Sequence, residues 1–101
     1  MKTQINKPDR HTEICAHLNE IYRRKNADYG DSFGETFRKL GIISAVTRIT
    51  DKVNRLQSLC VHAAQVHDES VKDTLLDLAN YAIMSVIELE RLNITETEET
   101  K

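Results

Sequence analysis

The sequence contains few of the residues that interrupt helices. Its 101 residues include one proline and three glycines, and all three glycines lie between residues 30 and 41. Tryptophan is absent, and three tyrosines and two phenylalanines are the aromatic residues. Because proline and glycine are the residues least compatible with a helix interior, these low counts favour an all-α fold. They also predict that the main irregular segment lies near residues 30–41.

Cysteines and long apolar runs are scarce as well. Cys15 and Cys60 are too few and too far apart for a disulfide framework or a zinc motif, which predicts reduced thiols in a cytoplasmic protein. The first ten residues lack the apolar stretch of a secretory signal, and no apolar run approaches the length of a membrane span. With a net charge of −2, we expect no direct binding to nucleic acid or to an anionic membrane.

The chain that remains has helical periodicity through most of its length. We expect a flexible leader over residues 1–8, a single all-α domain over residues 9–93 and a flexible acidic tail over residues 94–101. Residues 61–68 fit either a helical extension or a mobile connection. Within the domain we predict a long helix from Asp9 or Thr12 to about Lys25, followed by a loop from Asn26 to Glu35. A short helix from Thr36 to Leu40 comes next. Two further long helices run from Ile42 to about Cys60 and from Asp68 or Ser70 to about Asn93.

Three long helices and a short one do not close a good bundle easily. We therefore expect a second copy of the chain to complete the fold, in a homodimer or a homotetramer. One set of apolar residues in the last helix suits a seam between subunits, and equally suits the core of a monomer. These residues are Leu78, Ala82, Val86, Leu89 and Leu92.

Acidic residues form a row on the last predicted helix. At about 100° per residue, Glu69, Asp73, Asp77 and Asn80 fall within a sector of roughly 80°. No lysine or arginine occurs between Asp73 and Glu90. Neighbouring carboxylates beside apolar residues resist desolvation unless a cation lies among them, so the row predicts a site for Mg²⁺ or Mn²⁺. The alternative is a solvated acidic face.

The preceding long helix carries basic residues around one acid. Arg48, Asp51, Lys52 and Arg55 share a polar face. If this face lies opposite the acidic row, Asp51 completes the metal shell and the three basic side chains receive phosphate oxygens. The alternative is a set of local ion pairs on a surface helix.

The glycine-containing segment between the first two helices carries aromatic residues. Tyr29 could stack on a base, and Asp31 could bind the polar edge of that base or its sugar. Alternatively, Tyr29 and Phe33 fill the open end of the bundle.

Three blocks carry a resemblance to a known family: YGDSF, RITDKVNRL and ESVKDTLLDLANYA, in that order. Together they resemble a small bacterial and phage family known as the nucleotide-modification-associated domain, type one. The third block also resembles part of the metal motif of the all-α, MazG-like nucleoside triphosphate pyrophosphohydrolases. That likeness implies Mg²⁺ binding, cleavage between the α- and β-phosphates and an oligomeric, MazG-like bundle. Asp51, Asp73 and Asp77 match acids of the motif, whereas Arg48 and Thr74 stand where the superfamily has acids.

The combined prediction is a Mg²⁺-dependent enzyme that hydrolyses a canonical or modified (deoxy)nucleoside triphosphate to monophosphate and pyrophosphate. The alternative is a helical nucleotide-binding or protein-interaction module without catalysis, whose acidic row is solvated or paired with the basic residues. In the enzyme, the metal ligands would be Asp51, Glu69, Asp73 and Asp77, the catalytic residues Glu69 and Asp73, and the substrate-binding residues Tyr29, Asp31, Arg48, Lys52, Arg55 and Asn80.

Overall fold

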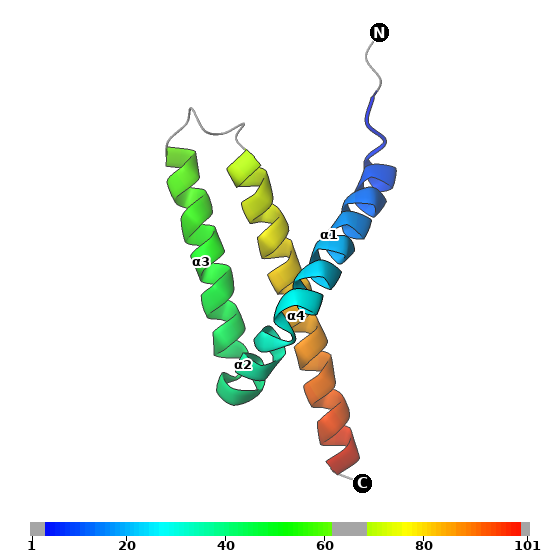
Figure 1. Ribbon diagram of the computed structural model, residues 1–101, viewed down its shortest axis with the longest axis vertical. Helices are drawn as coiled ribbons and strands as arrows, with labels where there is room; N and C mark the ends of the chain where they lie inside the picture. The colour runs from blue at the N-terminus through cyan, green and yellow to red at the C-terminus, as the bar shows by residue number, and fades with distance from the viewer. Residues whose placement is uncertain (1–3, 62–68, 100–101) are drawn as a thin grey trace. The chain divides into compact units, whose positions relative to one another are not determined.

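The computed structural model describes residues 4–61 and 69–99, which form four α-helices and no strand (Figure 1). This confirms the all-α prediction of three long helices and a short one. Within the same ranges, no helix combines the length and the apolar character needed to cross a membrane. The helices are α1 (Lys7–Tyr29), α2 (Ser32–Leu40), α3 (Ile42–Val61) and α4 (Glu69–Glu99).

The chain divides into two compact units, Met1–Gly30 and Asp31–Lys101. The first unit contains α1, which begins earlier than predicted because Asn6 caps it: the Asn6 side chain accepts a hydrogen bond from the Asp9 amide. Pro8 stands in the first turn, where its missing N–H costs nothing. The helix ends at Gly30, whose φ of 70° favours glycine.

The predicted loop from Asn26 to Glu35 is wrong, because only Gly30 and Asp31 separate α1 from α2. Asp31 caps α2: its Oδ1 accepts a hydrogen bond from the Gly34 amide at 3.2 Å. A Cβ at position 34 would lie 2.5 Å from Oδ2 of Asp31, so glycine inside this helix leaves room for the cap. Asp and Gly therefore mark a helix start here, where the sequence pattern indicated a longer loop.

The second unit is a pair of long helices with a short helix at one end. In Figure 1, α3 and α4 run side by side in opposite directions, and α2 contacts both. Its core contains the buried Phe33, Phe37 and Ala45, with Tyr81 and Met84 packed against them. The Phe33 ring centroid lies 6.3 Å from that of Phe37 and 5.9 Å from that of Tyr81. Phe33 therefore belongs to the core, which confirms for this residue the packing alternative.

The helix α3 begins as predicted and ends one residue later, at Val61. Its buried and half-buried side follows a four–three spacing, as expected for a helix packed along another. This side includes Ala45, Ile49, Lys52, Leu56 and Leu59. Val46 and Val53, by contrast, are exposed.

The helix α4 is longer than predicted and buries polar residues on its packed side. It continues to Glu99, six residues past the predicted end at Asn93, whereas the predicted connection lies in the undescribed residues 62–68. Among its described side chains, Thr74, Ser85 and Glu88 are buried and polar, and the half-buried Tyr81 and Met84 pack against the core.

Candidate functional site

An ion pair joins the middle of α3 to α4. Lys52 Nζ lies 3.2 Å from Asp77 Oδ2, and the two side chains are 27% and 32% exposed. The ammonium group also lies 5.9 Å from the centroid of the Tyr81 ring, within the range of a cation–π contact. Partial removal from water makes this pair less screened than a surface pair. An acid, a cation and an aromatic ring therefore meet at one half-buried place.

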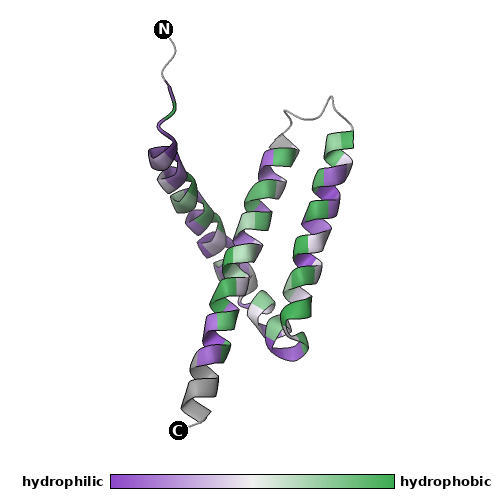
Figure 2. Cartoon of the chain, turned by 180° about the vertical axis from the view of Figure 1, so that it is seen from behind, coloured by the Kyte–Doolittle hydropathy of each residue, from purple (hydrophilic) through white to green (hydrophobic). Residues whose placement is uncertain are grey.

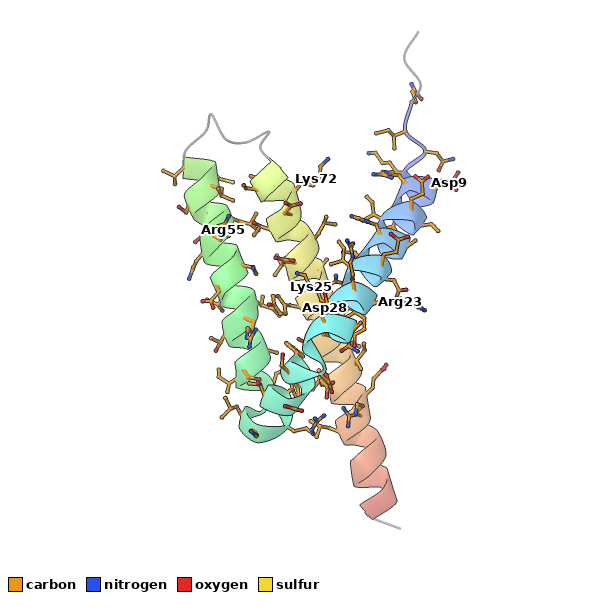
Figure 3. All side chains as sticks on the ribbon, viewed as in Figure 1. Asp9, Arg23, Lys25, Asp28, Arg55 and Lys72 are labelled. Carbon is orange, nitrogen blue, oxygen red and sulfur yellow. The ribbon has the colours of Figure 1, made fainter. Side chains whose placement is uncertain are left out.

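One turn along α3, Arg55 makes a second polar contact with α4. Its Nε donates to Thr74 Oγ1 at 3.3 Å, and that hydroxyl donates to the Ser70 carbonyl at 2.6 Å. Figure 3 shows Arg55 extending from α3 toward α4. Thr74 is buried and stands one turn before Asp77, on the side of α4 that meets α3. The structure thus brings Lys52 and Arg55, two of the three predicted basic residues, into contact with α4.

The predicted metal ligands are only partly brought together. Asp77 meets α3, whereas Asp51 and Asp73 are exposed, and the side chain of Glu69 lies outside the described residues. In the described part of the chain, no three His, Cys, Asp or Glu side chains gather closely enough to hold a metal ion. Asp73 and Asp77 nevertheless place hard oxygen donors on successive turns of one helix, which is chemistry that suits Mg²⁺. Metal binding stays a prediction.

The remaining predicted substrate residues are dispersed. Arg48 is exposed one turn before Lys52 on α3, and Asn80 is half-buried on α4. The side chain of Tyr29 lies outside the described residues. Asp31 is engaged as the cap of α2. A role for any of these four in nucleotide binding stays a prediction.

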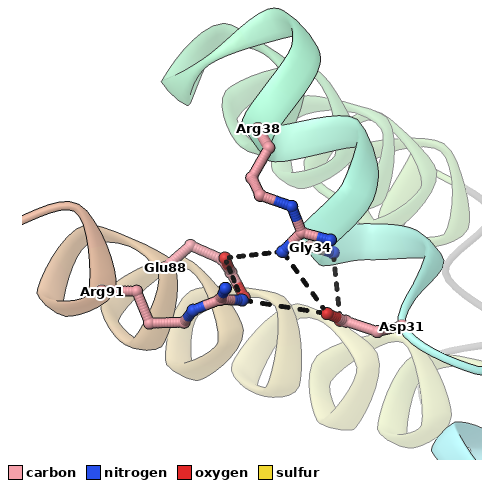
Figure 4. Close-up of polar contacts among 5 residues, drawn as sticks. All are labelled: Asp31, Gly34, Arg38, Glu88 and Arg91. Atoms are coloured by element: carbon pink, nitrogen blue, oxygen red, sulfur yellow. Dashed lines mark hydrogen bonds and ion pairs between the residues drawn. The ribbon is translucent and has the colours of Figure 1, made fainter. Parts of the chain in front are cut away.

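A second polar cluster joins α2 to α4, and sequence reasoning missed most of it. Figure 4 shows Arg38 and Arg91 around the carboxylates of Asp31 and Glu88. Arg91 Nη1 donates to Glu88 Oε1 at 3.3 Å, and Arg38 Nη1 lies 4.0 Å from the same oxygen. Arg38 and Arg91 also lie 3.7 Å and 3.9 Å from Asp31 Oδ2. The cluster therefore ties the cap of α2 to α4.

A shallow depression adjoins this cluster. The side chains of Phe37, Arg38, Glu88, Arg91 and Leu92 line it. The signal that could have revealed the cluster is the position of Glu88, eleven residues after Asp77. Eleven residues are about three turns, so both acids share one face of α4. Two acids on a packed face predict two sets of basic partners from neighbouring helices.

Replacing Glu88 with Gln is expected to destabilise the second compact unit, which contains α2, α3 and α4 and is called the α2–α4 unit below. The expected cost is about 1–2 kcal/mol, because a buried carboxylate between two guanidinium groups would lose its charge. The Glu88 side chain is 8% exposed, whereas the arginines are about half exposed, which keeps the expected cost moderate. Urea denaturation followed by circular dichroism measures the change. Glu35→Gln, at an exposed position of α2, is the matched control and should change stability by less than about 0.5 kcal/mol. Equal stability of the two variants would show that the cluster contributes nothing.

Comparison with known proteins identifies a family. A family model described as nucleotide modification associated domain 1 matches residues 25–89, which include α2, α3 and most of α4. No curated protein and no solved structure matches the chain.

Proposed function

The chain belongs to the nucleotide modification associated domain 1 family, and from this premise we propose that it is a cytoplasmic enzyme of nucleotide metabolism. The proposed substrate is a canonical or modified (deoxy)nucleoside triphosphate. The proposed reaction is Mg²⁺-dependent hydrolysis between the α- and β-phosphates, as in the MazG-like pyrophosphohydrolases that the third sequence block resembles. The proposed site is the surface shared by α3 and α4 around Lys52, Arg55 and Asp77.

One observation supports this location above the others: Lys52 and Asp77 meet across two helices at 3.2 Å, beside Tyr81. A nucleotide bound with a metal ion carries phosphate oxygens and a cation next to each other. Such a substrate needs an anion-binding group and a cation-binding group in adjacent positions. Lys52 and Asp77 provide this combination. Arg55, one turn away, adds a guanidinium suited to a further phosphate oxygen.

Asp73 and Asp77, with Glu69 one turn earlier, are the residues that would hold Mg²⁺. The ion would neutralise phosphate oxygens and lower the pKa of a bound water. Lys52 and Arg55 would hold the phosphate oxygens and stabilise the charge that develops during hydrolysis. Glu69 is the proposed residue for orienting or deprotonating the attacking water, and Asn80 could bind a polar group of the substrate.

A second function, nucleotide binding without catalysis, is favoured by the direct contact between Lys52 and Asp77. In that case Lys52 neutralises Asp77 permanently, and α3 and α4 form a rigid pair whose exposed basic residues bind phosphate. The two functions make opposite predictions about divalent metal. The enzyme needs the ion for turnover, whereas the binding module retains nucleotide in its absence.

A panel of ribo- and deoxynucleoside triphosphates tests the proposal directly. The full chain is incubated with each nucleotide and Mg²⁺, Mn²⁺ or a chelator, and the products are separated by ion-exchange chromatography. We expect monophosphate and pyrophosphate from at least one nucleotide, and none in chelator. Diphosphate and inorganic phosphate would contradict the proposed cleavage position. Tight nucleotide binding by calorimetry without turnover would favour the binding module.

A further inference from the structure

A continuous apolar face of α4 is exposed over about four turns. Its large side chains, Leu75, Ile83, Val86, Ile87 and Leu89, are 39–54% exposed. Ala79 and Ala82 lie between them. Figure 2 shows apolar residues along most of α4. Single exposed apolar residues are common on proteins, but a contiguous stripe of this length marks an interaction surface.

The opposite side of α4 is the packed one, and it is of mixed character. Thr74, Ser85 and Glu88 are buried there and engaged in hydrogen bonds or ion pairs, and the half-buried Tyr81 and Met84 pack against the core. A helix that packs only within its own subunit puts most of its large apolar side chains inward. Because α4 leaves a stripe of large apolar side chains outward, that stripe is available as a second packing surface.

We propose that a second copy of this chain covers the apolar face, with the two α4 helices antiparallel. The charges at the ends of the face support this arrangement. Lys72 and Glu90 are both exposed, and their separation of 18 residues is five helical turns, or about 27 Å. They therefore occupy the same angular position at opposite ends. Figure 3 shows Lys72 pointing away from α3.

A two-fold axis that relates antiparallel helices sets each end of the face against the opposite end of the partner. Lys72 then meets the partner's Glu90, and by symmetry Glu90 meets the partner's Lys72. The same register places Ala79 against the partner's Ile83, so that a small side chain meets a large one. A parallel pair would instead set Lys72 against Lys72 and Glu90 against Glu90. Charge complementarity therefore favours the antiparallel register.

The proposed seam revises the predicted one without covering the candidate site. Val86, Ala82 and Leu89 belong to both seams. Leu92, by contrast, lines the depression beside α2, and Leu78 is half-buried. Asp77, with Lys52, lies on the α3 side of α4. The dimer can therefore form whether or not the chain hydrolyses nucleotides, and the two proposals fail independently.

Sedimentation velocity of the full chain tests the proposal, at concentrations of about 1 to 100 µM, which span common dimer affinities. We expect a dimer, and we expect Val86→Glu to raise its dissociation constant roughly a hundredfold or more, because a charge would enter an apolar seam. Asn54→Glu, at an exposed position of α3, is the control and should leave the dissociation constant unchanged. Circular dichroism of each variant verifies that the helices remain. A monomeric wild type, or a dimer that Val86→Glu leaves intact, would overturn the proposal and assign the face to another segment or protein.

Charge reversal tests the register. Lys72→Glu and Glu90→Lys are each expected to weaken the dimer by roughly tenfold, because each creates two repulsive contacts by symmetry. The double variant Lys72→Glu/Glu90→Lys should recover wild-type affinity. A double variant that is as weak as the single variants would rule out the antiparallel register.

Discussion

Asp77→Asn is expected to reduce Mg²⁺-dependent turnover of a nucleoside triphosphate by roughly a hundredfold or more, with helical content unchanged. The substitution keeps the shape of the side chain and removes its charge. That charge holds Lys52 at 3.2 Å in the structure, and in the proposed function it would also bind the metal ion. Turnover is measured with the most active nucleotide of the panel, and circular dichroism reports the helices. Because Asp77 is about one-third exposed, an asparagine there should not unfold α4.

The control for this experiment is Glu35→Gln, which removes one negative charge from an exposed position of α2 and should leave turnover unchanged. Lys52→Met, which removes the cation and leaves the carboxylate, should also lower turnover, because the proposed mechanism places phosphate oxygens on Lys52. Full turnover by Asp77→Asn alone would remove this residue from the mechanism.

The spacing of residues along the sequence was sufficient to predict the elements whose bounds depend on neighbouring residues alone. Low proline and glycine content and a four–three spacing of apolar residues predicted the all-α fold and located α3 to within one residue at its end. The errors lie where a single contact decides the outcome. The loop prediction from Asn26 to Glu35 failed because one glycine and one capping aspartate complete the break between α1 and α2. Composition alone cannot distinguish such a cap from a longer loop.

The candidate site shows a different limit. The absence of basic residues on α4 from Asp73 to Glu90 suggested carboxylates in need of a cation. The structure brings a cation to one of them from another helix, since Lys52 on α3 pairs with Asp77. Helical spacing identifies partners three or four residues apart, but it does not identify partners on a different helix. The contact between Glu88 and Arg38 was missed for the same reason, because Arg38 lies on α2, whereas Arg91 is three residues from Glu88 on the same helix.

Apolar residues lie on more than one side of α4, which is why they could belong to a core or to a seam. Periodicity identifies apolar residues such as Val86 and Leu89, but it does not tell which neighbour covers them. In the structure Tyr81 and Met84 pack against the core, whereas Val86 and Leu89 are exposed. The proposed site and the proposed seam therefore lie on opposite sides of α4, with Asp77 on one side and Val86 on the other.

Phe37→Ala is expected to cost the α2–α4 unit about 3–5 kcal/mol, which would leave it largely unfolded at room temperature. Phe37 is 1% exposed and packs with Phe33 and Ala45 in a small core. Large deletions in such a core leave a cavity that the few surrounding side chains cannot fill. Because α2 is only nine residues long, it depends on this contact more than on its own helix propensity. Urea denaturation followed by circular dichroism measures the loss.

The matched control lies three residues away on the same helix. Leu40 is 64% exposed, so Leu40→Ala removes an apolar side chain of α2 without opening a cavity, and it should cost less than about 1 kcal/mol. Phe37→Leu should fall between the two, because it retains most of the buried apolar surface. A cost for Phe37→Ala no greater than that for Leu40→Ala would mean that the docking of α2 does not depend on Phe37. In that case the Arg38–Glu88 and Arg91–Asp31 contacts would have to hold α2 against α4, and the Glu88→Gln variant would become the more damaging substitution.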